Sequence, residues 1–143
     1  MTKHIALALA ALALGTLPQA GHTQSRGIAG DWTTQDGRAV VTISRCGSAI
    51  CGRLSRILAD TPDGPPVDEN NPNPRLRNRP VQGITVVSGF DERNGNVWRG
   101  GEIYDPESGR SYNARMTLNG NRLEVTGCVA WGAICRTETW TRR

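Results

Sequence analysis

A run of arginines and prolines, NNPNPRLRNRP at residues 70–80, is the first candidate for chemistry in this chain of 143 residues. In an extended backbone Arg75, Arg77 and Arg79 would share one side, and the prolines would help to hold the segment extended. Guanidinium groups in such a row could bind a carboxylate or a phosphate through paired hydrogen bonds. They could also pair with a carboxylate such as Asp68 and fix the segment over the fold, and arginine is the usual residue for such partly buried ties. The pattern favours loop closure and leaves anion binding open.

The expected folded part lacks the side chains that most catalytic sites use. Both histidines, His4 and His22, precede the first expected strand, and Lys3 is the only lysine. This composition disfavours a histidine-assisted nucleophile, a lysine Schiff base and a histidine metal site. We therefore expect no enzyme activity, no cofactor and no metal site.

Carboxylates are the remaining candidates for acid–base chemistry. Glu102, Asp105 and Glu107 lie close together at one expected strand end, and Asp91 and Glu92 lie at another. Glycoside-type hydrolysis would need two carboxyl groups about 5 Å or about 6.5–9.5 Å apart, with different pKa values. Turn formation and solvation explain Asp105 and Glu107 adequately, so a carboxylate-dependent hydrolase is the weakest of the functions considered.

The four cysteines form two closely spaced pairs, C-x4-C and C-x6-C. Four cysteines allow three pairings. We favour the two local disulfides, Cys46–Cys51 and Cys128–Cys135, each contributing about 2 kcal/mol by closing a tight loop in an oxidising compartment. A zinc site made of all four is the alternative, but the second spacing exceeds the usual two to four residues.

The N-terminus has the order of a secretory signal. A short basic start at Lys3 and His4 is followed by an apolar run over residues 5–17 and then by Pro-Gln-Ala, which predicts a signal peptide over residues 1–20, cleaved after Ala20. The protein would then be periplasmic or secreted. The apolar run is shorter than the about 20 residues that span a bilayer, so we expect no transmembrane segment. A retained N-terminal anchor is the alternative.

Positive and negative residues are interleaved along the expected mature chain and do not form long runs of like charge. Sixteen arginines face thirteen acidic residues, a net charge of +3, in stretches such as FDERNGNVWRGGE. Interleaved charge is typical of a solvated surface, whereas nucleic-acid binding would need a concentrated basic stripe. We expect no nucleic-acid partner.

From residue 30 onward the pattern is that of short strands. The dipeptides Asp-Gly and Asn-Gly mark tight hairpin turns, and β-branched runs with period-two alternation lie between them. Gly100-Gly101 predicts a bulge. The expected strands cover residues 30–35, 38–45, 51–58, 83–90, 96–104, 111–118, 122–128 and 134–141.

Strands with one apolar face must hide that face, and closing the sheet on itself does so. We therefore predict an all-β fold, an eight-stranded up-and-down antiparallel barrel, with an open sandwich as the alternative. It would form a single domain over residues 29–143, after an N-terminal tail at 21–28. The long loop at 59–80 exceeds the usual length of a structural connection.

The opening GDWTTQDG, with Gly30 and Trp32, resembles the Gly-x-Trp signature of lipocalin-like barrels. In those barrels the indole plugs the closed end and a late arginine packs across it. The resemblance makes Arg136 and Arg142 candidates for that partner, through a cation–π contact.

A longer resemblance follows from GDW, CGSAICGRL, DENNPNPRLRNRPVQG, YDPESGRSY and the terminal TWTR. Their order over about residues 29–142 resembles the secreted bacterial family called domain of unknown function 2147, whose members are similar to lipocalins and fatty-acid-binding proteins in barrel shape. The resemblance implies the fold and an envelope location, with Asp68 and Asn71 at structural positions of the first loop. No activity comes with it.

These observations lead to a non-catalytic barrel that binds a small apolar or amphipathic molecule. The acidic head of this molecule would contact Arg77 or Arg79. Trp98, Tyr112 and Met116 are further candidate ligand contacts. A filled barrel that acts as a structural or protein-interaction module of the envelope is the alternative. Oligomeric state is not indicated. The expected apolar lining is Val41, Ile43, Leu54, Ile84, Val86, Tyr112, Ala114 and Met116.

Overall fold

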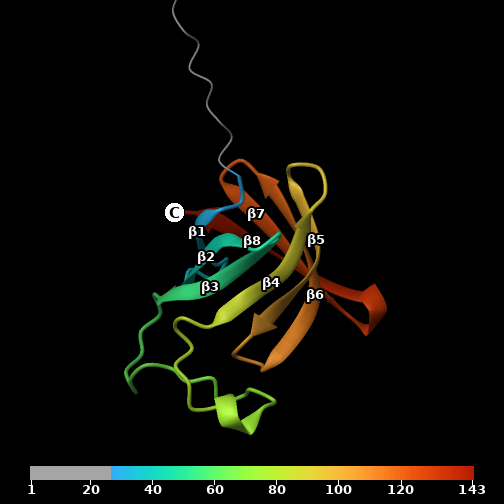
Figure 1. The fold of residues 1–143 in the computed structure, drawn as a ribbon. Helices are drawn as coiled ribbons and strands as arrows, with labels where there is room; N and C mark the ends of the chain where they lie inside the picture. The colour runs from blue at the N-terminus through green and yellow to red at the C-terminus, as the bar shows by residue number, and fades with distance from the viewer. Residues whose placement is uncertain (1–26) are drawn as a thin grey trace, which may run out of the picture.

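The computed structural model describes residues 27–143, which form one closed antiparallel barrel (Figure 1). Each strand pairs with the next in sequence and the first pairs with the last, so the predicted up-and-down barrel is confirmed. The expected signal peptide and residues 21–26 of the tail lie outside the described residues. Within the described range the strands are β1 Gly30–Thr33, β2 Ala39–Cys46, β3 Ala49–Ile57, β4 Thr85–Glu92, β5 Val97–Asp105, β6 Arg110–Asn119, β7 Arg122–Val129 and β8 Ile134–Arg142.

The barrel closes where the first strand meets the last. Trp32 pairs with Arg142 and Thr33 with Thr141 in an antiparallel register. The Trp32 side chain is fully buried, and its indole Nε1 donates a hydrogen bond to the carbonyl of Ile28 at 2.8 Å. The guanidinium carbon of Arg142 lies 4.2 Å from the centre of the same indole, which suits a cation–π contact. Trp32, Ile28 and Arg142 thus seal this end.

The closed half of the barrel is packed by large side chains. Phe90 is fully buried, and its ring lies against the backbone of Gly101, where a Cβ atom would come within 2.2 Å of the ring. The register shifts between Trp98 and Gly101, so the bulge predicted at the glycine pair is present. Glycine is needed there because any side chain would displace the phenylalanine.

The connections divide between the two ends of the barrel. Three tight turns and the N-terminal residues lie at the end that Trp32 seals, and the other four connections lie at the open end (Figure 1). Two of these are prominent: the long loop between β3 and β4, with a single 3₁₀ turn at Pro74–Leu76, and the β7–β8 connection, with a 3₁₀ turn at Ala130–Gly132. They project on opposite sides of the opening.

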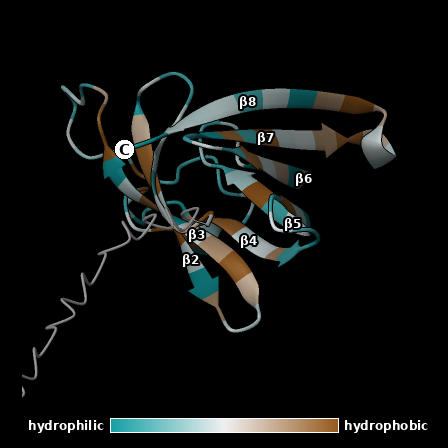
Figure 2. Cartoon of the chain, turned by 90° about the horizontal axis from the view of Figure 1, so that it is seen from above, coloured by the Kyte–Doolittle hydropathy of each residue, from teal (hydrophilic) through white to brown (hydrophobic). Residues whose placement is uncertain are grey.

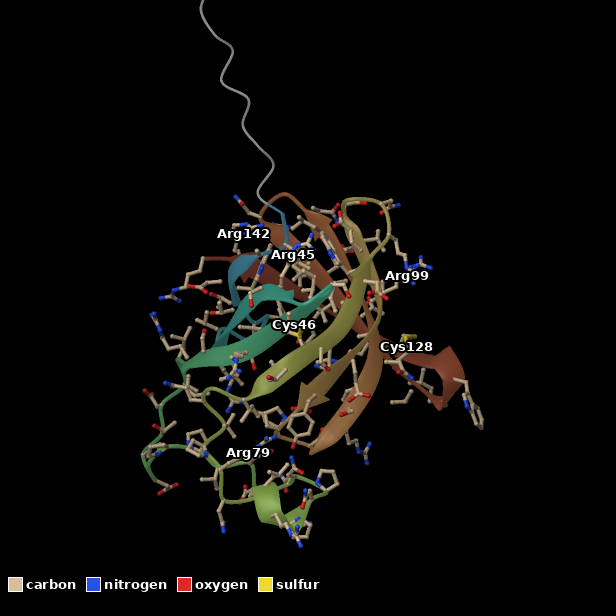
Figure 3. The ribbon with its side chains drawn as sticks, in the orientation of Figure 1. Arg45, Cys46, Arg79, Arg99, Cys128 and Arg142 are labelled. Atoms are coloured by element: carbon tan, nitrogen blue, oxygen red, sulfur yellow. A yellow bond between two sulfur atoms is a disulfide. The ribbon has the colours of Figure 1, made fainter. Side chains whose placement is uncertain are left out.

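Both predicted disulfides are present. Cys46–Cys51 joins β2 to β3, and Cys128–Cys135 joins β7 to β8, where the two cysteines face each other in register. Figure 3 shows Cys128 at the base of the projecting β7–β8 hairpin and Arg142 at the other end of the barrel. In the part of the chain that is described, no helix has the length and apolar character needed to cross a bilayer.

Candidate ligand-binding cavity

The open half of the barrel contains a cavity of about 1040 Å³. This exceeds the roughly 300 Å³ at which a cavity becomes large enough for a small organic ligand. Apolar side chains from opposite walls line its barrel part, and the long loop forms part of its rim. The apolar lining includes Val41, Leu54, Val86, Ile103, Val125 and Trp140.

Side-chain size along neighbouring strands explains why only one half is filled. Near the closed end, Leu118 of β6, Leu123 of β7 and Trp140 of β8 form one row across the wall. Two rows nearer the opening, the corresponding row is Ala114, Gly127 and Arg136. Gly127 and Arg136 line the cavity at this level, where the alanine and the glycine add little bulk to the wall.

Two charged residues of β8 face this space. Arg136 and Glu138 both line the cavity. The Glu138 carboxylate accepts a hydrogen bond from the Trp140 indole Nε1 at 3.3 Å. Among the residues that the structure describes, Arg136 makes no ion pair or hydrogen bond through its side chain. A guanidinium in this position can accept the carboxylate or phosphate of a bound molecule.

The long loop is held at the opening by a buried carboxylate. Asp68 is fully buried, and its oxygens accept hydrogen bonds from Tyr104 Oη at 2.5 Å, Asn71 Nδ2 at 2.8 Å and Arg79 Nε at 2.9 Å. The Nη2 atom of Arg79 also lies 2.8 Å from the carboxylate. We call Asp68, Asn71, Arg79 and Tyr104 the loop latch. Tyr104 belongs to β5, so the latch joins the loop to the barrel wall.

The electrostatics of the latch keep Asp68 ionised. Burial alone would raise the pKa of this carboxyl, but the hydrogen bonds from Tyr104, Asn71 and Arg79 outweigh it and hold the pKa below its usual range. Burial raises the pKa of Tyr104, and the adjacent carboxylate raises it further. The phenol therefore stays protonated and remains a donor to Asp68.

A second set of contacts joins the loop to the β5–β6 turn. Asn70 Nδ2 donates to the carbonyl of Glu107 at 2.7 Å. The backbone of Asn70 passes so close to Gly109 that a Cβ atom there would lie 1.8 Å from the Asn70 carbonyl oxygen. Arg38 of the β1–β2 turn pairs with the Glu107 carboxylate at 2.6 Å, although both side chains are mostly exposed. Three connections thus meet on one side of the opening.

The comparisons with known proteins agree with this architecture. The family model described as "Uncharacterized protein conserved in bacteria (DUF2147)" matches residues 30–142. The chain belongs to the DUF2147 family. The predicted family resemblance is thereby confirmed, while no curated protein matches the chain.

A solved structure gives the DUF2147 chain a lipocalin-like relative. It is described as "Protein HP1028 from the human pathogen Helicobacter pylori belongs to the lipocalin family". The two chains are 26% identical, the match covers 80% of this chain and 82% of that one, and the TM-score is 0.72. The barrel of this DUF2147 protein is thus similar to a lipocalin barrel.

The arginine run does not form the extended row that its prolines predict. Pro74–Leu76 forms a 3₁₀ turn, so the three arginines do not share one side. Arg77 Nε donates to the carbonyl of Asn71 at 2.8 Å, and Arg79 is committed to Asp68. Neither side chain lines the cavity. Their role in the structure is to close the loop, because both guanidinium groups have partners within it.

The other expected ligand contacts divide between the cavity and the core. Tyr112 lines the cavity. Trp98 and Met116 are instead buried in the packed half, with 2% and 0% of their surface exposed, and do not reach the space. Of the expected lining, Val41, Leu54, Val86 and Tyr112 line the cavity, whereas Ile43, Ile84, Ala114 and Met116 do not.

The late arginines also have separate positions. Arg142 lies over Trp32, and Arg136 does not, because Arg136 is at the opposite end of β8. The alternation on β8 could have shown this: Arg136, Glu138 and Trp140 share the face that turns inward. With Trp140 assigned to the core, Arg136 and Glu138 follow as interior residues.

The carboxylates considered for hydrolysis have structural partners. Asp105 accepts hydrogen bonds from the Glu107 backbone N–H at 3.0 Å and from Ser108 Oγ at 2.6 Å, which is the pattern of a turn. Glu107 pairs with Arg38, and Glu102 is exposed on the outer face. Within residues 27–143, no three His, Cys, Asp or Glu side chains gather in a group that could hold a metal ion.

Proposed function

We propose that this barrel binds one small amphipathic molecule, with its apolar part in the cavity and an acidic group at Arg136. The apolar walls around Val41, Leu54 and Val86 suit a hydrocarbon chain. Arg136 is the cavity-lining cation whose side chain has no protein partner among the described residues. The single observation that carries the proposal is this free guanidinium in a cavity of about 1040 Å³ whose barrel walls are largely apolar.

The proposal replaces Arg77 and Arg79 with Arg136 as the residue that would meet an acidic head. It concerns binding without catalysis, which suits a lipocalin-like barrel. The two disulfides indicate an oxidising environment. We further infer that the protein works in the periplasm or outside the cell, as the expected signal peptide implies.

A pair of ligands that differ only in the head group tests the proposal. Delipidated protein is titrated calorimetrically with hexadecanoic acid and with the matching alcohol. We expect the acid to bind about tenfold more tightly, because a charge-assisted pair contributes more than a neutral hydrogen bond. Arg136→Gln should remove that preference and leave the affinity for the alcohol nearly unchanged.

Arg122→Gln is the matched control, since Arg122 is an exposed arginine of β7 at the closed end. It should bind both compounds as the wild-type protein does. If neither compound binds with a Kd below about 100 µM, the proposal is wrong. If the acid preference persists in Arg136→Gln, the head-group assignment is wrong.

A further inference from the structure

The tip of the β7–β8 hairpin exposes apolar side chains that nothing in the barrel covers. We call residues 128–135 the hairpin tip. Trp131 is fully exposed at 105% of its reference surface, Ile134 is 66% exposed and Val129 is 38% exposed. The hairpin projects away from the barrel, and the strand ends next to it are strongly hydrophobic (Figure 2). Clustered exposed apolar side chains on a soluble domain indicate an interaction site.

The backbone holds the hairpin tip in this projecting form. The Cys128–Cys135 disulfide closes its base, and Val129 pairs with Ile134 immediately beyond. Ala130 and Trp131 have φ angles of 51° and 53°, a left-handed conformation that is unfavourable for residues other than glycine. Strained residues persist only where the surrounding structure determines them. The disulfide and the short ladder supply that constraint and leave the indole exposed.

The shape and charge of the hairpin tip decide which partner suits it. The tip projects from the barrel, so it can insert into the surface of a partner but cannot surround a partner. The hairpin tip itself contains no charged residue, Arg136 follows it directly, and Glu124 and Glu138 lie further along β7 and β8. The neighbouring strand β6 adds exposed Arg110 and Arg115. Tryptophan and isoleucine at an apex with arginines behind it suit the interface of an anionic bilayer, where the indole lies at head-group depth.

We propose that the hairpin tip docks this protein on an anionic membrane surface. Gly127 and Arg136 flank the disulfide and also line the cavity, so docking would bring the opening of the barrel to the lipid surface. Each arginine near such a surface strengthens binding by about fivefold. The proposal goes beyond ligand binding, and docking requires nothing in the cavity.

Tryptophan fluorescence can report on this site in the full chain. Trp131 is fully exposed, whereas Trp32, Trp98 and Trp140 are no more than 4% exposed, and the part of the emission change that Trp131→Ala removes is assigned to Trp131. The protein is mixed with vesicles of phosphatidylethanolamine and phosphatidylglycerol, and separately with vesicles of phosphatidylcholine alone. With the anionic vesicles we expect a blue shift, protection from acrylamide and quenching by brominated lipid chains. The phosphatidylcholine vesicles should bind at least tenfold more weakly.

Variants assign the binding to the hairpin tip. Trp131→Ala and Ile134→Ser should each reduce co-sedimentation with anionic vesicles, the former by at least about tenfold. Leu58→Ser and Val67→Ser remove apolar side chains of the long loop that are 37% and 42% exposed, similar to Val129 at 38%, and should bind normally. All these chains have the same N-terminus, so a difference between them belongs to the substituted site.

Two results would overturn the proposal. One is equal vesicle binding by Trp131→Ala and the wild-type protein. The other is a Trp131 emission that does not change when vesicles are added but shifts with protein concentration. That result would show that a second copy of the chain covers the tip. A failure to bind hexadecanoic acid would affect the ligand proposal alone, since vesicle binding is measured without ligand.

Discussion

Two connections flank the opening of this barrel, and the burial of their side chains is the reverse of what their sequences would suggest. The β3–β4 loop is rich in charged residues and proline, yet it contains the fully buried Asp68. The β7–β8 hairpin tip is mostly apolar, yet it contains the fully exposed Trp131. The difference lies in what holds each segment. Hydrogen bonds and an ion pair of the loop latch hold the loop against the barrel wall, whereas the Cys128–Cys135 disulfide at its own base holds the tip.

The comparison shows how a barrel can keep one end open. An apolar loop over the opening would collapse into the cavity, because burial of its side chains is favourable. A loop held by an ion pair and hydrogen bonds at one side stays at the rim. The apolar segment on the other side is too short and too constrained to fold inward. The space in between is the cavity.

The largest effect is expected when the loop latch is broken. Asp68→Ala removes the acceptor shared by Tyr104, Asn71 and Arg79, so we expect the free energy of unfolding to fall by about 3 kcal/mol. Urea denaturation followed by circular dichroism measures the change. A loss below about 0.5 kcal/mol, the range of ordinary surface substitutions, would show that the loop does not depend on the latch.

The pH dependence of the same variant identifies the ionised carboxylate as the cause. The pKa of Asp68 is lower in the folded protein than the roughly 3.9 of an unfolded chain. Its contribution is therefore fully present above that value and is lost as the pH falls through the lower, folded pKa. The stability difference between the wild-type protein and Asp68→Ala should be constant near neutral pH and shrink below about pH 4.

A smaller effect is expected where the loop touches the β5–β6 turn. Gly109→Ala would place a Cβ atom against the Asn70 carbonyl and also strain a backbone with φ of 69°. Gly120→Ala has a similar φ of 61° but open space around the new atom, so it isolates the backbone cost. We expect losses of about 2 kcal/mol and about 1 kcal/mol respectively. Equal losses in thermal or urea unfolding would mean that the loop moves aside without cost.

The fold could be predicted from the sequence because its signals are local. Period-two alternation, Asn-Gly turns and the paired cysteines each specify a hairpin, and consecutive hairpins with one apolar face lead to a closed sheet. The seal at Trp32 came from a resemblance to lipocalin-like barrels. For these features, neighbouring residues or a short motif carry the information.

The candidate site was harder to predict from the sequence because it depends on contacts between segments that are far apart in the chain. Arg79 meets a carboxylate eleven residues away and Tyr104 meets the same group from another strand, and neither partner is marked in the sequence. The prolines suggested an extended row, but a 3₁₀ turn redirected the arginines. Gly127 lines the cavity, and only the register shows that another small residue, Ala114, lies beside it in the wall.

The smallest effect on stability is expected at the hairpin tip itself. Trp131→Ala removes a large side chain that makes no buried contact, so the free energy of unfolding should change by less than about 0.5 kcal/mol. Urea denaturation beside Asp68→Ala gives the comparison directly. A loss of more than about 1 kcal/mol would mean that the indole packs on the barrel in solution. The tip would then resemble the loop, and the contrast between the two sides of the opening would disappear.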